Sequence, residues 1–304
     1  MKPLSIIYNK KSGFHITQNA DDIYAQVMSY LSEHGFDVYA YDLGEVQDFD
    51  KLMDEVLERH QNDENTGVVV AAGGDGTLNA VASKLIHTDI PMGILPLGTF
   101  NYVARVLNIP LELMQAVEVI ATGQTRDVHV AKINDKIYLN NASLGLYPLF
   151  IEKREFYNKK FGRFPLNAYT SGLDVLIRNR KELKLEVEID GKKYPVKTPL
   201  VFFGNNQLQL ADMHLHIAEC AEKGQVAGVV VATSSKLNWF KILVKLIRGA
   251  IDHASNVYSF AADQVKIHSK SKKITLAIDG ELFQVQPPLN ISVAKNALKM
   301  MVPK

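Results

Sequence analysis

The sequence predicts an α/β protein in which a Rossmann-like parallel α/β domain is followed by an antiparallel β-sandwich domain. Over the first ~130 residues, short apolar runs alternate with helical patterns, which is typical of βαβ units. From Arg126 onward, many short apolar runs are separated by turn signals, which is typical of a sandwich. A glycine-rich turn at residues 73–77 separates a strand from a helix, and turns of this kind hold ligands in parallel sheets.

The first half of the chain is predicted as alternating strands and helices joined by right-handed crossovers. The expected strands are 4–8, 37–41, 67–72 and 92–95. The expected helices are 20–34, 48–60, 77–87, 101–107 and 111–122. Strands separated in this way by helices form a parallel sheet.

The second half is predicted as short antiparallel strands, with turns at Asn134-Asp135 and Asp190-Gly191. Two helical patterns interrupt them, at 163–179 and 236–251. The expected strands lie in the runs RDVHVAKIN, KIYLNNASLG, ELKLEVEID, KKYPVKTPLVFFGN, MHLHIAEC, GQVAGVVVATS, QVKIHSK and KKITLAIDG.

Composition limits the class of protein. The chain has 304 residues, of which 47% are hydrophobic and 22% are charged, an ordinary balance for a globular protein of two domains. A net charge of +1 gives no field that would attract nucleic acid. The single cysteine, Cys220, excludes an internal disulfide and is expected to be a small buried apolar residue. No segment has the ~20 apolar residues of a spanning helix, so we expect a cytoplasmic protein.

The run VVVAAGGDGTLNAVASKL, residues 68–85, predicts an anion-binding corner. Gly73, Gly74 and Gly76 are expected to turn the chain with positive φ and to let backbone amides approach a ligand. The helix that follows from Thr77 presents its N-terminus to a phosphate. Asp75 then holds Mg²⁺ or accepts a proton; the alternative is that it only caps the helix.

A second strand–turn–helix corner follows in MGILPLGTFNYVARVL, residues 92–107. Its turn contains Pro96, Gly98, Thr99 and Asn101, and its helix is expected to begin near Tyr102. Two such corners in succession place both turns at the carboxyl ends of adjacent parallel strands, where open α/β sheets bind ligands.

The blocks GGDGTLNAVAS and PLGTFNYVAR together resemble the catalytic domain of the diacylglycerol kinase and sphingosine kinase superfamily, in particular its soluble bacterial lipid kinases. NAD kinases and phosphofructokinases share only the first block. Residues 3–13 resemble the family's first strand and N-P-x-S-G loop, with Asn9, Ser12 and Gly13 kept and Lys10 in the place of proline. Residues 274–283, ITLAIDGELF, resemble its late D-G-E strand, although IDGE alone also predicts a plain hairpin turn.

The resemblance implies an ATP-dependent lipid kinase with its active site in a cleft between two domains. It implies a nucleotide-binding domain at 1–128, completed by 290–304, and a lipid-substrate sandwich at 129–289. Glu281 is the expected general base for the lipid hydroxyl, with Asp279 as its partner across Gly280.

The resemblance also implies the residues that bind ATP and Mg²⁺. Asp75 and Asp127 are the expected metal residues, although Asp127 also fits a plain polar residue at a strand start. Arg105 is expected to reach the phosphates; the alternative is a solvated helix arginine. The expected ATP-binding residues are Asn9, Gly73, Gly74, Asp75, Gly76, Thr77, Asn79, Thr99, Asn101 and Arg105.

Three positions depart from the family pattern. Tyr102 stands where most relatives have an aspartate, so one acidic contributor to the metal network is missing. Ala80 replaces a glutamate in the first block. Lys223-Gly224-Gln225 stands where relatives that bind a second, structural Mg²⁺ have D-G-x-L, so no second metal is expected.

Access to a lipid predicts transient contact with the inner membrane surface. Residues 235–253 form either an interfacial helix or a helix packed on the sandwich, and the basic, aromatic loop 152–164 is either a headgroup contact or a solvated loop.

His214 and His216 have a metal-like spacing but no evident third ligand. The sequence leaves monomer and homodimer open. Two rival functions are an NAD-kinase-like small-molecule kinase and a nucleotide- or lipid-binding protein that has lost turnover.

Overall fold

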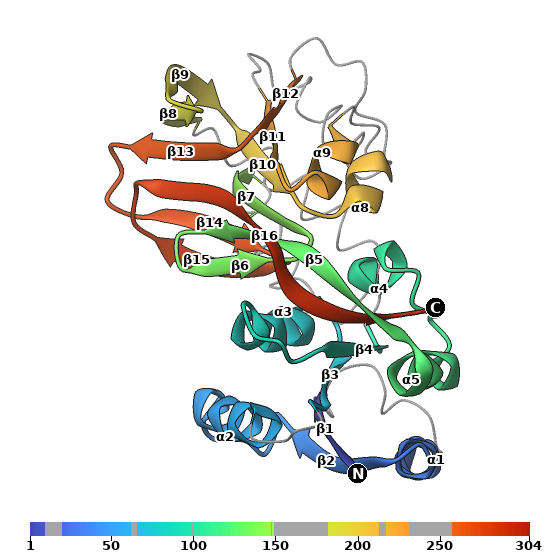
Figure 1. The fold of residues 1–304 in the computed structure, drawn as a ribbon. Coiled ribbons are helices and arrows are strands. Elements are labelled where there is room, and N and C mark those ends of the chain that lie inside the picture. The colour runs from blue at the N-terminus through green and yellow to red at the C-terminus, as the bar shows by residue number, and fades with distance from the viewer. Residues whose placement is uncertain are drawn as a thin grey trace. The chain divides into compact units, whose positions relative to one another are not determined.

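The structure, a computed structural model, forms two compact units (Figure 1). It describes residues 1–9, 20–61, 66–98, 100–146, 148, 182–212, 217–231 and 257–304. Unit 1 consists of Met1–Val130 and Lys295–Lys304, and unit 2 of Ala131–Ala294. Two strands, β5 (Gln124–Ile133) and β16 (Leu289–Val302), run from one unit into the other.

Unit 1 is built on a parallel sheet with the strand order β2-β1-β3-β4. These strands are β1 (Lys2–Tyr8), β2 (Phe36–Asp42), β3 (Val68–Gly73) and β4 (Met92–Pro96). Every residue of β3 and β4 is buried, as expected for strands covered on both faces. The end of β16 joins β4 in parallel, with Met300 opposite Met92.

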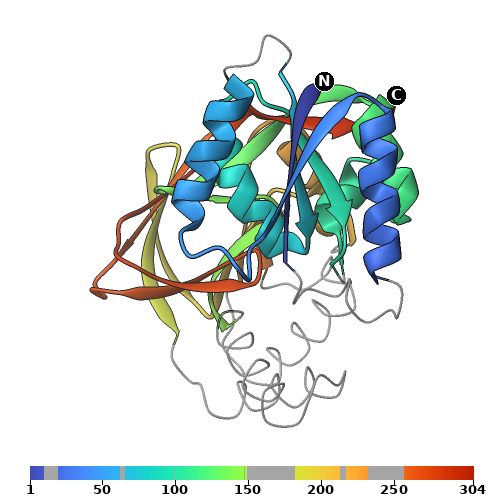
Figure 2. The ribbon, with the colours of Figure 1, turned by 90° about the horizontal axis from the view of Figure 1, so that it is seen from below.

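Helices cover both faces of this sheet. Figure 2 shows α2 (Phe49–Gln61) and α3 (Asp75–Leu85) on one face, and α1 (Ala20–Glu33) and α5 (Leu113–Thr122) on the other. The short helix α4 (Tyr102–Val106) follows β4. Each long helix is amphipathic; in α2, Leu52, Met53, Val56 and His60 form the buried stripe.

Unit 2 contains two antiparallel sheets. In the first, the start of β16 pairs with β13 (Gln264–Ser269), which pairs with β8 (Leu183–Ile189), which pairs with β9 (Lys192–Thr198). The last residues of β5 form a hairpin with β6 (Lys136–Tyr138). The second sheet has the order β12 (Val257–Ala262), β11 (Val226–Val231), β10 (Leu200–Gly204), β7 (Asn141–Gly145), β14 (Ile274–Ile278) and β15 (Glu281–Val285).

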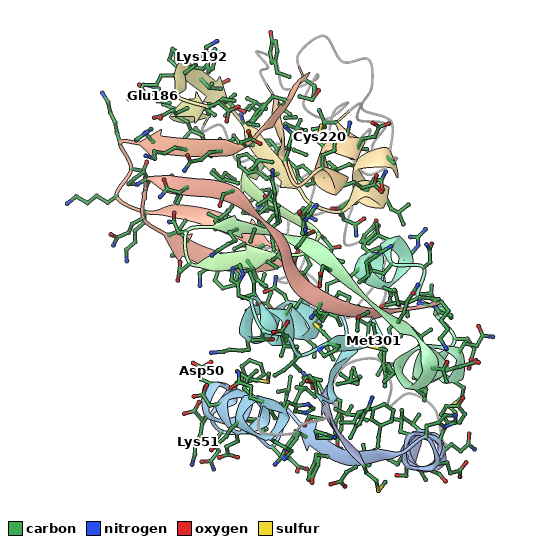
Figure 3. All side chains as sticks on the ribbon, in the orientation of Figure 1. Asp50, Lys51, Glu186, Lys192, Cys220 and Met301 are labelled. Atoms are coloured by element: carbon green, nitrogen blue, oxygen red, sulfur yellow. The ribbon has the colours of Figure 1, made fainter. Side chains whose placement is uncertain are left out.

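The two sheets share one apolar core, which makes unit 2 a sandwich. Val187 and Ile267 come from the first sheet, and Leu144, Phe203 and Leu276 come from the second. On the other face of the second sheet, a smaller cluster includes residues of β10 and β11 and of two short helices, α8 (Gln207–Asp212) and α9 (Ala218–Glu222). Figure 3 shows Cys220 on α9; the residue is half-buried and packs against this cluster.

The predicted fold class is confirmed, and each element expected in the first half is present within a few residues of its predicted bounds. The prediction of a strand in MHLHIAEC is wrong at the C-terminal end of that run, because Ala218–Glu222 is helical. Ile217 and Ala221 are buried there against β10 and β11, and a short apolar pattern does not separate a helix from a strand. The helical patterns at 163–179 and 236–251 lie outside the described residues.

Candidate functional site

The two predicted corners lie side by side in unit 1. Strands β3 and β4 are parallel neighbours, with Gly73 opposite Pro96, and the backbone N–H of Leu97 donates to the carbonyl of Gly73 at 3.2 Å. A Cβ atom on Gly98 would lie only 2.8 Å from the Cα atom of Gly74. The two turns therefore pack backbone against backbone, and the expected adjacency of their strands is confirmed.

The positive φ expected for the three glycines of the first turn is wrong. Gly74 has φ −89° and ψ −178°, Gly73 is not in the positive-φ region, and Gly76 is inside helix α3. The requirement for glycine is steric instead. A Cβ atom on Gly73 would lie 2.7 Å from the Oγ1 atom of Thr77, so a side chain there would collide with the first turn of α3.

Helix α3 begins at Asp75, two residues earlier than expected from the sequence, and Gly74 is its N-cap. The first intrahelical bond runs from the N–H of Leu78 to the carbonyl of Gly74 at 3.1 Å. The N–H groups of Asp75, Gly76 and Thr77 precede this bond and have no carbonyl of the helix to bind. Because Asp75 is the first helical residue, it does not hold the N-cap position that the capping alternative assigns to it.

Such a helix start suits a phosphate. The residues from Gly74 to Thr77 are half-buried, so an anion there would be partly shielded from water. Backbone N–H groups and the helix dipole both favour negative charge at this point. The side chain of Asn79 is half-buried one turn further along α3.

The second turn is shaped by the side chain of Asn101. This residue has φ 50°, and its Oδ1 atom accepts from the N–H of Gly98 at 2.9 Å. Its Nδ2 atom donates to the carbonyls of Gly98 and Pro96, at 2.9 and 3.3 Å. Asn101 therefore closes the loop, and the nucleotide contact expected of it stays a prediction. Thr99 lies outside the described residues.

An aromatic stack occupies the position of the missing family aspartate. The rings of Phe100 and Tyr102 are 5.7 Å apart and nearly parallel, and the guanidinium carbon of Arg105 lies 5.9 Å from the Tyr102 ring centroid. Phe100 is 57% exposed. Tyr102 and Arg105 thus form an aromatic and cationic surface beside the second turn, at the position where the resemblance led us to expect an acid.

The remaining metal candidate, Asp127, is exposed on β5. Its charge contributes to a raised pKa of Lys299, whose main cause is a hydrogen bond from Lys299 Nζ to Asp89 Oδ1 at 2.9 Å. Within the described part of the chain, no three His, Cys, Asp or Glu side chains converge as metal ligands. Whether Asp127 shares a metal with Asp75 stays a prediction.

Two more polar residues end strands at the same edge of the parallel sheet. Asn9 follows β1 and is half-buried. Asp42 ends β2, is 7% exposed, and accepts from the N–H of Gly44 at 2.9 Å through its Oδ1 atom. Asp42 follows the second predicted strand directly and was not singled out from the sequence. Lys10, Ser12 and Gly13 lie outside the described residues.

The D-G-E segment of unit 2 forms a two-residue hairpin between β14 and β15. Asp279 and Gly280 have φ 45° and 90°, and Ile278 lies opposite Glu281. The plain hairpin expected for IDGE alone is therefore present. Glu281 is exposed at the start of β15, and none of the described residues forms a hydrogen bond with its side chain.

The Asp279 carboxylate binds backbone N–H groups. Its Oδ2 atom accepts from Leu139 at 2.8 Å, and its Oδ1 atom accepts from Asn140 and Asn141, both at 2.9 Å. These bonds occupy both oxygens of the carboxylate. Asp279 is thus anchored in the connection between β6 and β7.

Comparison with known families agrees with this geometry. The diacylglycerol kinase catalytic domain matches residues 3–133, and the YegS C-terminal NAD kinase beta sandwich-like domain matches residues 158–302. The chain belongs to the diacylglycerol kinase catalytic domain family. The match to the catalytic domain contains both corners, and the match to the YegS C-terminal domain contains the D-G-E hairpin.

Individual members of the diacylglycerol kinase family are similar over most of their length. A diacylglycerol kinase of Staphylococcus aureus strain JH9 is 28% identical over 284 residues, which cover 92% of this chain and 86% of the relative. A crystal structure of a diacylglycerol kinase from Bacillus anthracis strain Sterne has a TM-score of 0.73 at 18% identity, over 99% of this chain and 97% of that one. Yeast NADH kinase has a TM-score of 0.53 at 11% identity, over 100% of this chain and 84% of that one. At these identities, the likeness to either structure shows a shared fold only.

Proposed function

We propose that this protein is an ATP-dependent lipid kinase that transfers the γ-phosphoryl group of ATP to the hydroxyl of diacylglycerol or a related lipid. The observation that carries the proposal is the start of α3 packed against the second turn, in a chain of the diacylglycerol kinase family. Kinases of this family use ATP. An open helix N-terminus is the kind of site that holds a triphosphate.

In unit 1, the N–H groups of Gly74, Gly76 and Thr77 bind phosphate oxygens in this proposal. Gly73 keeps the turn free of a side chain, and Asn9 and Asn79 bind the nucleotide from neighbouring positions. Arg105 neutralises phosphate charge, while Thr99 and Asn101 complete the second turn. Phosphoryl transfer depends mostly on such positioning and charge neutralisation, and these residues supply both.

A magnesium ion fits this corner if the nucleotide supplies most of its ligands. Mg²⁺ is usually held by one or two carboxylates together with substrate phosphates and water. Asp75, at the start of α3, is a suitable carboxylate, with Asp127 as the second candidate. When bound, the ion would neutralise charge that develops on the transferring group.

On the lipid side, Glu281 is the proposed general base. Its carboxylate takes the proton of the lipid hydroxyl as that oxygen forms a bond to the γ-phosphorus. The bond from the γ-phosphorus to the oxygen bridging the β- and γ-phosphates then breaks, and ADP leaves. The carboxylate of Glu281 is exposed and has no hydrogen-bond partner among the residues that the structure describes, which supports this role. We propose Asp279 as its partner in the turn.

Two observations favour rival functions. The fold likeness to yeast NADH kinase is consistent with a small-molecule kinase that phosphorylates a dinucleotide. The aromatic stack of Tyr102 in place of an acid is consistent with a binding protein that has lost turnover. The P-L-G-T-x-N block and the D-G-E hairpin together favour the lipid kinase over both.

An assay with labelled ATP separates these functions. Purified protein is incubated with Mg²⁺ and mixed micelles that contain diacylglycerol, monoacylglycerol, ceramide or sphingosine, or with NAD instead of lipid. We expect label in a lipid and none in NAD, and we expect Asp75→Ala to abolish it. Label in NAD alone would support the dinucleotide kinase, and equal background in wild type and variant would support the binding protein.

A lipid kinase must also meet a bilayer. Of the helices that the structure describes, none is both long and apolar enough to cross a membrane. Because the proposed substrate is a lipid, we propose that the protein is cytoplasmic and touches the inner membrane surface transiently. The segments expected to make that contact, 152–164 and 235–253, lie outside the described residues, as do His214 and His216. A homodimer remains a prediction that sedimentation would test.

A further inference from the structure

The hairpin that carries Glu281 is tied to two distant segments of unit 2 by hydrogen bonds. Asp279 binds the three consecutive N–H groups from Leu139 to Asn141, and its own N–H donates to the carbonyl of Asn141 at 2.9 Å. The side chains of Asn140 and Asn141 are 3% and 6% exposed. The hairpin is therefore fixed to the start of β7 by both the side chain and the backbone of Asp279.

A second layer of bonds links the same segment to helix α8. The Nδ2 atom of Asn206 donates to Oδ1 of Asn140 at 3.0 Å, and the Nδ2 atom of Asn141 donates to Oε1 of Gln209 at 2.9 Å. Oδ1 of Asn206 accepts from the N–H of Gln209 at 3.1 Å, which caps the first turn of α8. The backbone N–H groups of Asn205 and Asn206 both donate to the carbonyl of Asn140.

This network is more extensive than other turns of the same unit require. Two further hairpins, at Asn134-Asp135 and Asp190-Gly191, also begin with a residue at positive φ. Oδ1 of Asn134 accepts from the N–H of Asn290, and Oδ1 of Asp190 accepts from the N–H groups of Asp263 and Gln264. Both turns are exposed and use one side-chain oxygen, whereas Asp279 uses both of its oxygens, and two of its three partners, Asn140 and Asn141, are bonded to Asn206 and Gln209 at the start of α8.

A buried polar network is costly unless its members have partners, and a network with its partners in place makes the surrounding backbone rigid. Among the described residues, the one buried side-chain atom of this network that has no partner is Oδ1 of Asn141. Here the anchored residue, Asp279, lies two residues before Glu281. A general base needs its carboxylate held within hydrogen-bond reach of the proton that it removes. The network is therefore well placed to hold Glu281, whose side chain has no hydrogen-bond partner among the described residues.

We propose that Asp279, Asn140, Asn141, Asn206 and Gln209 form a positioning network that holds the hairpin of Glu281, with Asp279 acting as the anchor of that turn and not as a second proton acceptor. The proposal rests on the assignment of Glu281 as general base. It adds helix α8 to the residues on which catalysis depends, although α8 carries none of the predicted site residues.

Amide hydrogen exchange tests the structural part without any need for turnover. In Asn206→Ser, a serine still caps α8 but cannot reach Asn140, so the helix is kept and the link is removed. We expect exchange at 139–141 and 279–282 to rise at least tenfold in Asn206→Ser and in Asp279→Asn, compared with wild type. Unchanged exchange at 279–282 in Asn206→Ser would overturn the proposal.

Kinetics test the link to catalysis. We expect Asn206→Ser and Asp279→Asn to lower kcat by roughly tenfold to a hundredfold, as for displaced catalytic groups, with KM for ATP within about twofold of wild type. The shape of the pH–rate profile should stay the same, because Glu281 is still the group that titrates. Loss of a limb of that profile in Asp279→Asn would instead make Asp279 a proton acceptor and overturn the proposal.

Asp190→Asn is the matched control, since it alters the same kind of Asp-Gly turn on a hairpin that carries no predicted site residue. We expect it to leave kcat unchanged; a loss equal to that of Asp279→Asn would show general destabilisation and contradict the proposal.

If wild-type protein phosphorylates no lipid, the proposed function fails, and with it the catalytic part of this proposal. The exchange result still decides whether α8 holds the hairpin.

Discussion

At the scale of single residues, Gly74 and Gly98 meet at the ligand corner but differ in how much room they leave. A Cβ atom on Gly98 would lie 2.8 Å from both Gly74 Cα and Asn101 Oδ1. A Cβ atom on Gly74 would have Gly98 Cα as its nearest neighbour, at an ordinary 3.6 Å, and Gly74 has an unstrained φ of −89°. The corner therefore has room for a Cβ atom at Gly74 but not at Gly98.

We therefore expect Gly98→Ala to destabilise the protein by about 1–3 kcal/mol, because backbone atoms must move apart. Gly74→Ala is the matched control and should leave the free energy of unfolding within about 1 kcal/mol of wild type. It should nevertheless weaken ATP binding, since the new methyl group lies where a phosphate approaches the backbone. Urea unfolding and ATP titration measure the two effects; equal stability losses in both variants would contradict this account.

Tyr138, at the end of β6, gives a pH-dependent prediction. Its side chain is 0% exposed, and its hydroxyl has no hydrogen-bond partner among the described residues. Burial, and then the charge of Asp279, raise the pKa of this phenol far above its usual value of 10.0. The stability that follows from this raised pKa is complete below pH 10 and is lost as the pH rises from there toward the folded-state pKa.

Above pH 10 we expect wild-type protein to lose up to about 1.4 kcal/mol of stability per pH unit through Tyr138. Tyr138→Phe should lack this loss, and at pH 7 its stability should be within about 1 kcal/mol of wild type, since the hydroxyl has no hydrogen-bond partner to lose in the part of the chain that the structure describes. Urea unfolding at pH 7, 9 and 11 measures both quantities. Parallel pH dependence of the two proteins would show that the phenol ionises freely in the folded state.

At the scale of elements, the sequence predicted the strands, helices and hairpins that depend on local signals. The alternation of strands and helices in the first half follows from periodicity and glycine turns, and the Asn134-Asp135, Asp190-Gly191 and Asp279-Gly280 hairpins follow from residues that tolerate positive φ. Helix α8 and the helical end of MHLHIAEC were not predicted. Both are short, so their state is set by packing on β10 and β11 and not by local pattern.

The contacts that shape the candidate site could not be predicted from the sequence either. Asp279 binds N–H groups 138 to 140 positions away, and Asn206 binds Asn140 across 66 positions. Similarly, the role of Asn101 as the residue that closes its loop depends on three bonds that no spacing rule contains. Residue types could suggest a ligand site, but which polar groups already have partners only became visible in three dimensions.

At the scale of the whole molecule, the C-terminal segment completes unit 1. Lys295–Lys304 belongs to that unit, and Met300 of β16 lies opposite Met92 of β4. The side chains of Leu298, Met300 and Met301 are 1%, 1% and 7% exposed. The last strand of the chain is therefore part of the core that supports the two corners.

Removal of residues 297–304 should consequently unfold unit 1 or make the protein insoluble, because several large buried side chains are lost together. Removal of Lys304 alone, which is exposed, is the control and should change the melting temperature by no more than a few degrees. Thermal unfolding and solubility on expression measure the outcome. A truncated protein that melts like wild type would show that β16 is dispensable for unit 1.

The central claim is that a triphosphate bound at the start of α3 reacts with a lipid hydroxyl whose proton is removed by Glu281. The most direct measurement is the rate of phosphate transfer to diacylglycerol at saturating ATP, in wild type and in Glu281→Gln. We predict transfer by wild type and a rate lower by about 10²–10⁴-fold in the variant, with ATP affinity unchanged. Equal rates in the two proteins, or no transfer by wild type, would contradict it.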